Sequence, residues 1–217
     1  MRNFDLIVFD WDGTLVDSTA HIAQSIQKSY ADNDLPVPDE AAAKHVIGLG
    51  LLDTFNYLSP DLTKKQHQGI VDRYRHHFLD ADKTIHAFKG TSEGLQALTQ
   101  RNYLLAVATG KSRVGLDRAL KEVGFGHLFS VTRCGDEGFP KPHPDMLQFI
   151  MNDLAVTPDR TLMIGDTTHD LLLAQNAGTC GVGVSYGAHD KDGLIALNPL
   201  ACVDSFEELM VWLLENG

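Results

Sequence analysis

The stretch "VFDWDGTLVD", residues 8–17, places three aspartates directly after a run of apolar residues. Leu6 to Phe9 are all apolar, which is the pattern of a strand buried on both faces of a parallel sheet. Because Asp10 and Asp12 follow this run at once, charge gathers at the carboxyl end of the strand. The stretch therefore predicts a sheet core with a polar site at one edge.

Further apolar runs of strand length follow along the chain, at residues 103–110, 129–136, 160–166 and 180–187. Segments with helical spacing of apolar residues separate them, at residues 112–124, 143–156 and 168–178. Strands that alternate with helices predict an α/β fold, a Rossmann-like parallel sheet with helices on both faces. Right-handed crossovers bring every strand's carboxyl end to one edge, where ligands bind in such sheets.

Residues 19–86 interrupt this alternation, because they contain helical patterns and no buried-strand pattern. We expect an all-helical cap domain of residues 18–86, inserted after the first strand into a core of residues 1–17 and 87–217. Asp17 and Ser18 are expected to begin the connection and to cap the first helix of the insert. An insert that leaves and returns at the ligand edge is well placed to act as a lid.

The composition limits the partners and the compartment. The formal net charge of −11 lacks the clustered Lys and Arg that nucleic acids or anionic membrane surfaces require. No apolar stretch approaches the ~18 residues of a membrane helix. The three cysteines have no metal-site or redox-motif spacing, so reduced thiols in a cytoplasmic protein are the simplest interpretation. A small-molecule partner is the remaining expectation.

Polar residues follow the ends of the predicted strands. The second strand ends in Thr109-Gly110, Lys141 lies in "PKPHP" after the third, and Asp166 follows the fourth, with Asp170 one helical turn later. In adjacent parallel strands these groups meet Asp10 and Asp12 at one edge.

Four carboxylates in a small volume repel one another unless positive charge offsets them. Lys141 supplies one charge, and Mg²⁺, which prefers oxygen ligands, supplies two more. Such a site favours a phosphate guest. Gly13 and Gly110 allow backbone N–H groups to approach its oxygens, and the Thr109 hydroxyl adds a donor.

Four motifs carry a family resemblance. "DWDGTLVDS" resembles the DxDGT motif of the haloacid dehalogenase superfamily, "LLAVATG" its second motif, "PKP" its third and "GDTTHD" its GDxxxD motif. The motifs occur in the family's order and span the chain. The helical insert resembles the cap of the phosphoglycolate phosphatase and β-phosphoglucomutase branch.

The resemblance implies a role for each matching residue. Asp10 would be the nucleophile that forms an aspartyl-phosphate, as well as a metal ligand. Asp12 would protonate the leaving group, deprotonate the attacking water and lend its backbone carbonyl to Mg²⁺. Asp166 would ligate the metal directly, and Asp170 would ligate it or hold one of its waters. Thr109 and Lys141 would bind the transferring phosphoryl group, with Lys141 also paired to Asp10.

Several functions fit these motifs. The leading hypothesis is a Mg²⁺-dependent phosphatase of a small, phosphoglycolate-like metabolite. A β-phosphoglucomutase-type mutase must grip a second phosphate, and the cap segment "VIGLGLL", residues 46–52, carries no basic residue for it. That segment is either a helix break or a loop that closes over substrate.

Three more functions fit the motifs less well. A haloacid dehalogenase would lack the second aspartate, Asp12, and a non-catalytic binding protein would not need the full motif set. A phosphonatase would need a buried cap lysine. The candidates are Lys28, Lys44, Lys64, Lys65 and Lys83.

Overall fold

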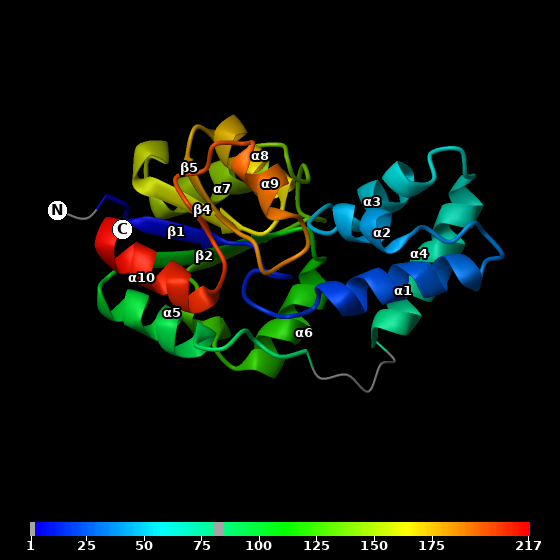
Figure 1. Cartoon of the computed structure of the whole chain (residues 1–217), viewed down its shortest axis with the longest axis horizontal. Coiled ribbons are helices and arrows are strands. Elements are labelled where there is room, and N and C mark those ends of the chain that lie inside the picture. The colour runs from blue at the N-terminus through cyan, green and yellow to red at the C-terminus, as the bar shows by residue number, and fades with distance from the viewer. Residues whose placement is uncertain (1–2, 80–84) are drawn as a thin grey trace.

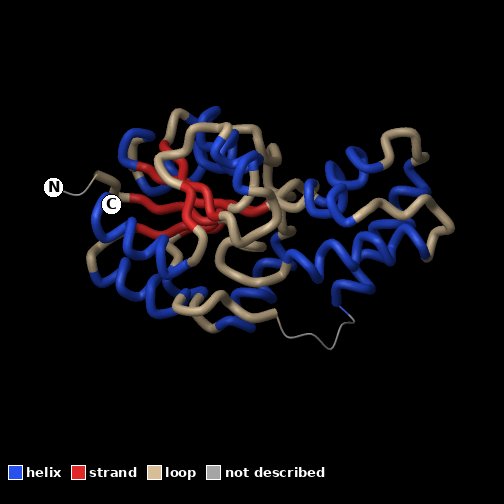
Figure 2. The backbone as a smooth tube through the Cα atoms, viewed as in Figure 1, coloured by secondary structure: helices blue, strands red, loops and turns tan. Residues whose placement is uncertain are grey.

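The computed structural model describes residues 3–79 and 85–217. Within these ranges the centre is a sheet of six parallel strands in the order β3-β2-β1-β4-β5-β6 (Figures 1 and 2). The strands are β1 (Leu6–Phe9), β2 (Leu104–Thr109), β3 (Val131–Cys134), β4 (Thr161–Gly165), β5 (Cys180–Val184) and β6 (Cys202–Val203). The predicted fold class, a Rossmann-like parallel sheet, is confirmed.

The register of β1 explains where the polar residues meet. β1 lies between β2 and β4, and its last residue, Phe9, is level with Val107 and Ile164. The N–H of Asp10 continues this ladder by donating to the Ile164 carbonyl at 2.9 Å. Asp10 therefore leaves the sheet beside the carboxyl ends of both neighbouring strands.

Helices cover both faces of the sheet, as Figure 2 shows. Alternate side chains of β1 point to opposite faces of the sheet: Ile7 and Phe9 belong to one apolar cluster, and Leu6 and Val8 to the other. The first cluster includes residues of α5 (Thr91–Gln100), α6 (Arg113–Val123) and α10 (Phe206–Asn216). The second includes residues of α7 (Asp145–Leu154) and α8 (Thr168–Ala177). α9 (Lys191–Ile195) and two 3₁₀ turns (Gly126–Leu128 and Pro158–Arg160) complete this part.

The predicted core elements are present with trimmed ends. The five predicted strands correspond to β1–β5, and the three predicted helices to α6, α7 and α8. β6, α5, α9 and α10 were not predicted. Among helices of the described ranges, none combines the length and hydropathy that a membrane crossing requires.

Four helices form a unit beside the sheet, at the right of Figure 1: α1 (Thr19–Ala31), α2 (Glu40–His45), α3 (Leu51–Leu58) and α4 (Lys64–Leu79). The helical cap after the first strand is therefore present. It has its own buried cluster, with Ile26, Tyr30, Phe55 and Ile70 nearly inaccessible. Residues 80–84, the end of the predicted helical stretch with Lys83, lie outside the described residues.

The two connections between sheet and cap run side by side. The Asp17 N–H donates to the His86 carbonyl at 2.9 Å, and the Phe88 N–H donates to Leu15 at 3.1 Å. Asp17 is exposed at this crossing. We accordingly propose the division into a core of residues 1–17 and 87–217 and a cap of residues 18–86.

Candidate active site

Three carboxylates meet at the carboxyl edge of the sheet. Asp10 follows β1, Asp166 follows β4 and Asp170 lies in the first turn of α8. One oxygen of each lies within 4.8 Å of the others, and all three residues are buried. The Lys141 ammonium lies 2.8 Å from Asp10 Oδ1 and 2.6 Å from Asp170 Oδ1, with its side chain fully buried. The structure thus brings together the aspartates of two sequence motifs and the lysine of a third.

Two of these carboxylates are fixed by hydrogen bonds. Asp166 accepts from the Thr14 hydroxyl at 2.7 Å and from the Ala188 N–H at 2.8 Å. Asp170 Oδ2 accepts from the hydroxyl and the N–H of Thr167, which forms a capping box at the start of α8. Since Lys141 contacts the other oxygen of Asp170, both oxygens of that carboxylate have protein partners.

Burial and mutual repulsion disturb the titration of the cluster. Burial, opposed by Lys141 and reinforced by Asp170, raises the pKa of Asp10 from 3.8 to about 7. Burial and then the charge of Asp10 raise the pKa of Asp166 well above its usual range. Burial disfavours charge on Lys141, but Asp10 and Asp170 outweigh it and raise its pKa. The single positive charge of Lys141 therefore does not neutralise the three carboxylates of the cluster.

The residues present fit a hard divalent cation. The buried Oδ2 of Asp10 has no partner within the described residues, while Oδ1 contacts the Lys141 ammonium at 2.8 Å. Asp10 and Asp166 point oxygens at one small volume, and carboxylate oxygens are the ligands that Mg²⁺ takes. A bound cation would supply the missing charge.

The raised pKa of Asp10 predicts a pH effect on the metal-free protein. Folded Asp10 holds a proton between about pH 4 and pH 7, where the unfolded carboxyl has lost it. Its contribution to stability is therefore present below pH 4 and is lost as pH rises through 7, by up to about 1.4 kcal/mol per pH unit. Urea unfolding in EDTA at pH 5 and pH 8 should show a larger loss for the wild type than for Asp10→Asn. Equal losses would contradict this account.

Asp12 lies outside the carboxylate cluster and has different partners. The Lys111 ammonium lies 2.8 Å from Asp12 Oδ2, and the Ser18 hydroxyl donates to Oδ1 at 2.7 Å. The same ammonium stands 4.8 Å above the Phe78 ring of the cap. Ser18 does stand at the N-cap position before α1, but its side chain makes no capping bond, so the prediction that it caps the helix with its side chain is wrong. Lys111 was missed, although it directly follows Thr109-Gly110 at the end of a strand.

Replacing Lys111 by methionine is expected to lower kcat by about tenfold or more. The change removes the cation that contacts Asp12, and the proton transfer that the motif implies for Asp12 would, if misaligned, lose part of its ~10²–10⁴-fold contribution. Steady-state phosphate release measures the effect. Lys89→Met, which removes an exposed lysine paired with Glu207, is the control and should leave kcat unchanged. A fully active Lys111→Met enzyme would contradict this role.

The remaining predicted binding residues also lie at this edge. Thr109 is buried, lines the cavity beside Asp10, and its hydroxyl accepts from the Lys111 N–H at 3.2 Å. Gly13 has a φ of +84°, and a side chain there would collide with Asp166. Its N–H donates to the Val16 carbonyl, so Gly13 offers the site space. A side chain at Gly110 would collide with carbonyl groups of the cap loop.

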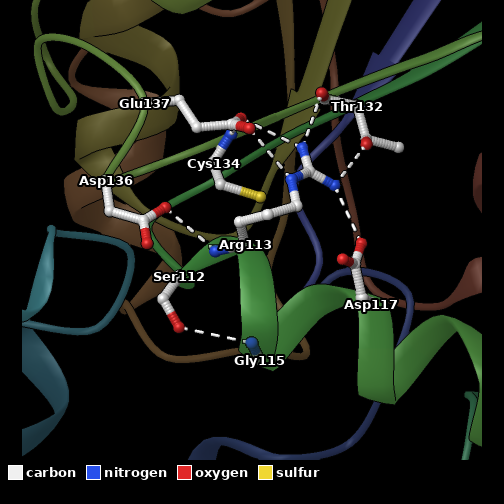
Figure 3. Close-up of polar contacts among 8 residues, drawn as sticks. All are labelled: Ser112, Arg113, Gly115, Asp117, Thr132, Cys134, Asp136 and Glu137. Atoms are coloured by element: carbon white, nitrogen blue, oxygen red, sulfur yellow. Dashed lines mark hydrogen bonds and ion pairs between the residues drawn. The ribbon is translucent and has the colours of Figure 1, made fainter.

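An arginine connects the loops around the site (Figure 3). The Arg113 guanidinium, at the start of α6, donates twice to Glu137, at 2.9 and 3.0 Å, and to the carbonyl and hydroxyl of Thr132. The Gly135 N–H adds a bond to the Lys111 carbonyl at 3.0 Å. These contacts tie the loop that carries Lys111 to β3 and to the turn that follows it.

The cap contacts the core beside the carboxylates. The His45 carbonyl, at the end of α2, lies 2.9 Å from His169 Nε2 and 3.0 Å from His189 Nε2 of the core. Because the Thr168 N–H donates to His189 Nδ1, the Nε2 of that ring carries the proton and donates to the cap. Beside this contact, Gly48 in the 46–52 loop lies against Thr167 and Gly110. The cap is closed over this side of the site.

A Rossmann-like sheet with a helical cap, and with acidic and basic side chains meeting at its carboxyl edge, is the arrangement of an α/β protein with a ligand site at the ends of its strands. A family model described as haloacid dehalogenase-like hydrolase matches residues 7–184. The chain belongs to this family, and the resemblance seen in its motifs is confirmed.

Relatives and solved structures agree with this assignment. A probable phosphatase, IndB, of Dickeya dadantii is 34% identical, covering 94% of this chain and 91% of the relative. A phosphoglycolate phosphatase of Mannheimia succiniciproducens is 29% identical, covering 95% and 97%. A crystal structure described as a predicted phosphoglycolate phosphatase from Haemophilus somnus superposes with a TM-score of 0.84 at 28% identity, covering 97% and 98%.

Proposed function

We propose that this enzyme is a Mg²⁺-dependent phosphatase that hydrolyses small phosphate monoesters through an aspartyl-phosphate on Asp10. One observation carries the proposal. Asp10 is a buried carboxylate that lines the cavity, is held through Oδ1 by the Lys141 ammonium at 2.8 Å, and has no partner for Oδ2 within the described residues. An oxygen of this kind is available to attack phosphorus.

The proposed reaction has two steps. In the first, an Asp10 oxygen attacks phosphorus, the bond to the ester oxygen breaks, and Asp12 gives its proton to the departing alcohol. In the second, water attacks the aspartyl-phosphate, Asp12 takes a proton from that water, and inorganic phosphate leaves with Asp10 restored. Ser18 and Lys111 hold the Asp12 carboxylate beside the cavity for both transfers.

The other residues would bind and orient the phosphoryl group. Lys141 and the Thr109 hydroxyl would meet its oxygens, and the lysine keeps Asp10 in place. Asp10 and Asp166, with the Asp12 carbonyl, would hold Mg²⁺, which when bound supplies positive charge against the phosphate oxygens. Since Asp170 is engaged by Lys141 and Thr167, we assign it to hold a metal-bound water.

The second candidate function is phosphoryl transfer of the β-phosphoglucomutase type, which uses the same nucleophile. It lacks support in the cap, because the 46–52 loop brings no cation for a second phosphate. Among the cap lysines that the structure describes, none supports a phosphonatase: Lys28, Lys64 and Lys65 are exposed, and Lys44 is half-buried and paired with Glu40, while Lys83 lies outside the described residues. We infer a cytoplasmic enzyme, in line with its unpaired cysteines.

Removal of the metal tests the proposal. Purified enzyme with Mg²⁺ is expected to release phosphate from p-nitrophenyl phosphate, and EDTA should reduce the rate to background, because the carboxylate cluster then lacks its counter-charge. Readdition of Mg²⁺ in excess over EDTA is the control and should restore the rate. Full activity in EDTA would overturn the metal assignment, and no release under any condition would overturn the phosphatase.

A further inference from the structure

The site opens into a cavity of about 530 Å³ between the cap and the core. Asp10 and Asp12 lie among its lining residues, together with residues of α1, α4 and the 46–52 loop from the cap and of α6 from the core. This volume lies within the ~300–1,000 Å³ of sites that enclose drug-sized ligands. A two-carbon substrate such as phosphoglycolate would leave most of it unfilled.

The cap walls of this cavity are apolar. Ile22 and Ile26 of α1, Val46 and Leu51 around the loop, and Phe78 of α4 all line it. Leu51 and Phe78 remain partly exposed and provide apolar surface that a ligand can cover, whereas Ile22, Ile26 and Val46, at most 7% exposed, form the packed layer behind them. Closure by the His45 contact holds these side chains over the carboxylates. Apolar surface that lines the cavity favours an apolar ligand, because binding removes the apolar surfaces of both partners from water.

The basic side chains that line this cavity are either paired with a carboxylate or exposed to solvent. Lys111 pairs with Asp12 at 2.8 Å, and Arg118 pairs with Glu122 at 2.7 Å. Arg75, the cation that the cap contributes to the lining, is exposed. A second anionic group on the substrate would therefore enter an apolar pocket whose largely buried cation, Lys111, already has Asp12 as its partner, which is costly.

We propose that the enzyme's preferred substrates are phosphate monoesters whose alcohol carries a sizeable, uncharged apolar or aromatic group. The inference rests on the proposed phosphatase activity and adds the class of leaving group. The phosphate meets Lys141 and Asp10, and the body of the alcohol fills the space between α1, α4 and α6. Phosphoglycolate, whose leaving group ends in a carboxylate, is a poor fit.

Three esters of primary alcohols test whether the enzyme prefers an apolar leaving group: ethyl phosphate, 2-phenylethyl phosphate and phosphoglycolate. The first two share the reacting group and differ in the apolar body. We expect kcat/KM for 2-phenylethyl phosphate to exceed that for ethyl phosphate by about 100-fold, and to exceed that for phosphoglycolate as well. Equal values for the two uncharged esters, or a higher value for phosphoglycolate, would overturn the inference and leave the phosphatase standing.

A matched pair of variants locates the effect. Leu51 lines the cavity, whereas its neighbour Leu52 in α3 is 65% exposed and does not. Leu51→Gln should reduce the preference for 2-phenylethyl over ethyl phosphate by about tenfold, and Leu52→Gln should keep it. The ratio of two substrates on one protein sample is insensitive to partial unfolding. An unchanged ratio in Leu51→Gln would contradict the assignment of this wall.

A binding measurement distinguishes this inference from a failure of catalysis. With Mg²⁺, 2-phenylethylphosphonate, which cannot be hydrolysed, should raise the melting temperature at lower concentration than ethylphosphonate does. This result would support the apolar pocket even if no ester were turned over, a case that would remove the phosphatase proposal alone. Equal stabilisation by both phosphonates would remove the apolar pocket.

Discussion

Asp10→Asn is expected to lower kcat by about 10⁴-fold or more while leaving the fold intact. Asparagine has nearly the same shape but lacks the anionic oxygen that attacks phosphorus, so neither step of the proposed reaction can begin. The fold should tolerate the change, because it removes one of three mutually repelling buried carboxylates. Phosphate release with Mg²⁺ measures the loss, and circular dichroism with urea unfolding checks the fold.

Asp17→Asn is the matched control for this experiment. Asp17 belongs to the same sequence stretch, but it is exposed where the chain enters the cap. We expect its replacement to leave kcat unchanged. If Asp10→Asn retained full activity, Asp10 would not be the nucleophile, and loss of activity in both variants would point to a structural fault in this turn.

The fold could be predicted from the sequence wherever a buried element contains a run of several consecutive apolar residues. β1, with four consecutive buried apolar residues, is such a case, and its position between β2 and β4 follows from the parallel α/β pattern. β6 contains two residues, Cys202 and Val203, so it is too short to show a period. Its pairing with β5 depends on long-range packing that the local sequence does not encode.

The candidate site shows the same division between local and long-range information. Because parallel strands end at one edge, the sequence predicted that Asp10, Asp166 and Lys141 would meet. Ser18 was predicted to cap a helix from local preference, but a nearby carboxylate, Asp12, competes successfully for its hydroxyl. Lys111, like Thr109, lies at the carboxyl end of β2, so the expectation that such residues reach the ligand edge of the sheet could have identified it.

The cap loop could not be interpreted from its composition. Residues 46–50 separate α2 from α3, which confirms the helix break, and this loop also lies against Gly110 and lines the cavity, while its closure over a substrate stays a prediction. Leu51 belongs to the wall and Leu52 to the surface, although the two side chains are identical in chemistry. Only the direction of each side chain in α3 separates them.

Lys141→Met is expected to lower the free energy of unfolding of the metal-free protein by about 3–5 kcal/mol at pH 8, and to abolish turnover. The variant leaves Asp10 and Asp170 buried without their shared counter-charge, which costs far more than an exposed pair. At pH 5 the loss should be smaller, because Asp10, whose pKa is already raised to about 7, can bind a proton instead. Urea unfolding in EDTA at both pH values measures the difference.

Lys191→Met provides the matched control for this last prediction. Lys191 contacts both oxygens of Asp204, at 2.6 and 2.7 Å, but this pair lies in solvent. Since water already solvates both partners, we expect no measurable change in stability or in phosphate release. If Lys141→Met were as stable as Lys191→Met at pH 8, the buried ammonium would not be what holds the carboxylates of Asp10 and Asp170 together. The raised pKa of Lys141 would then have no energetic consequence, which is incompatible with an ion pair in this environment.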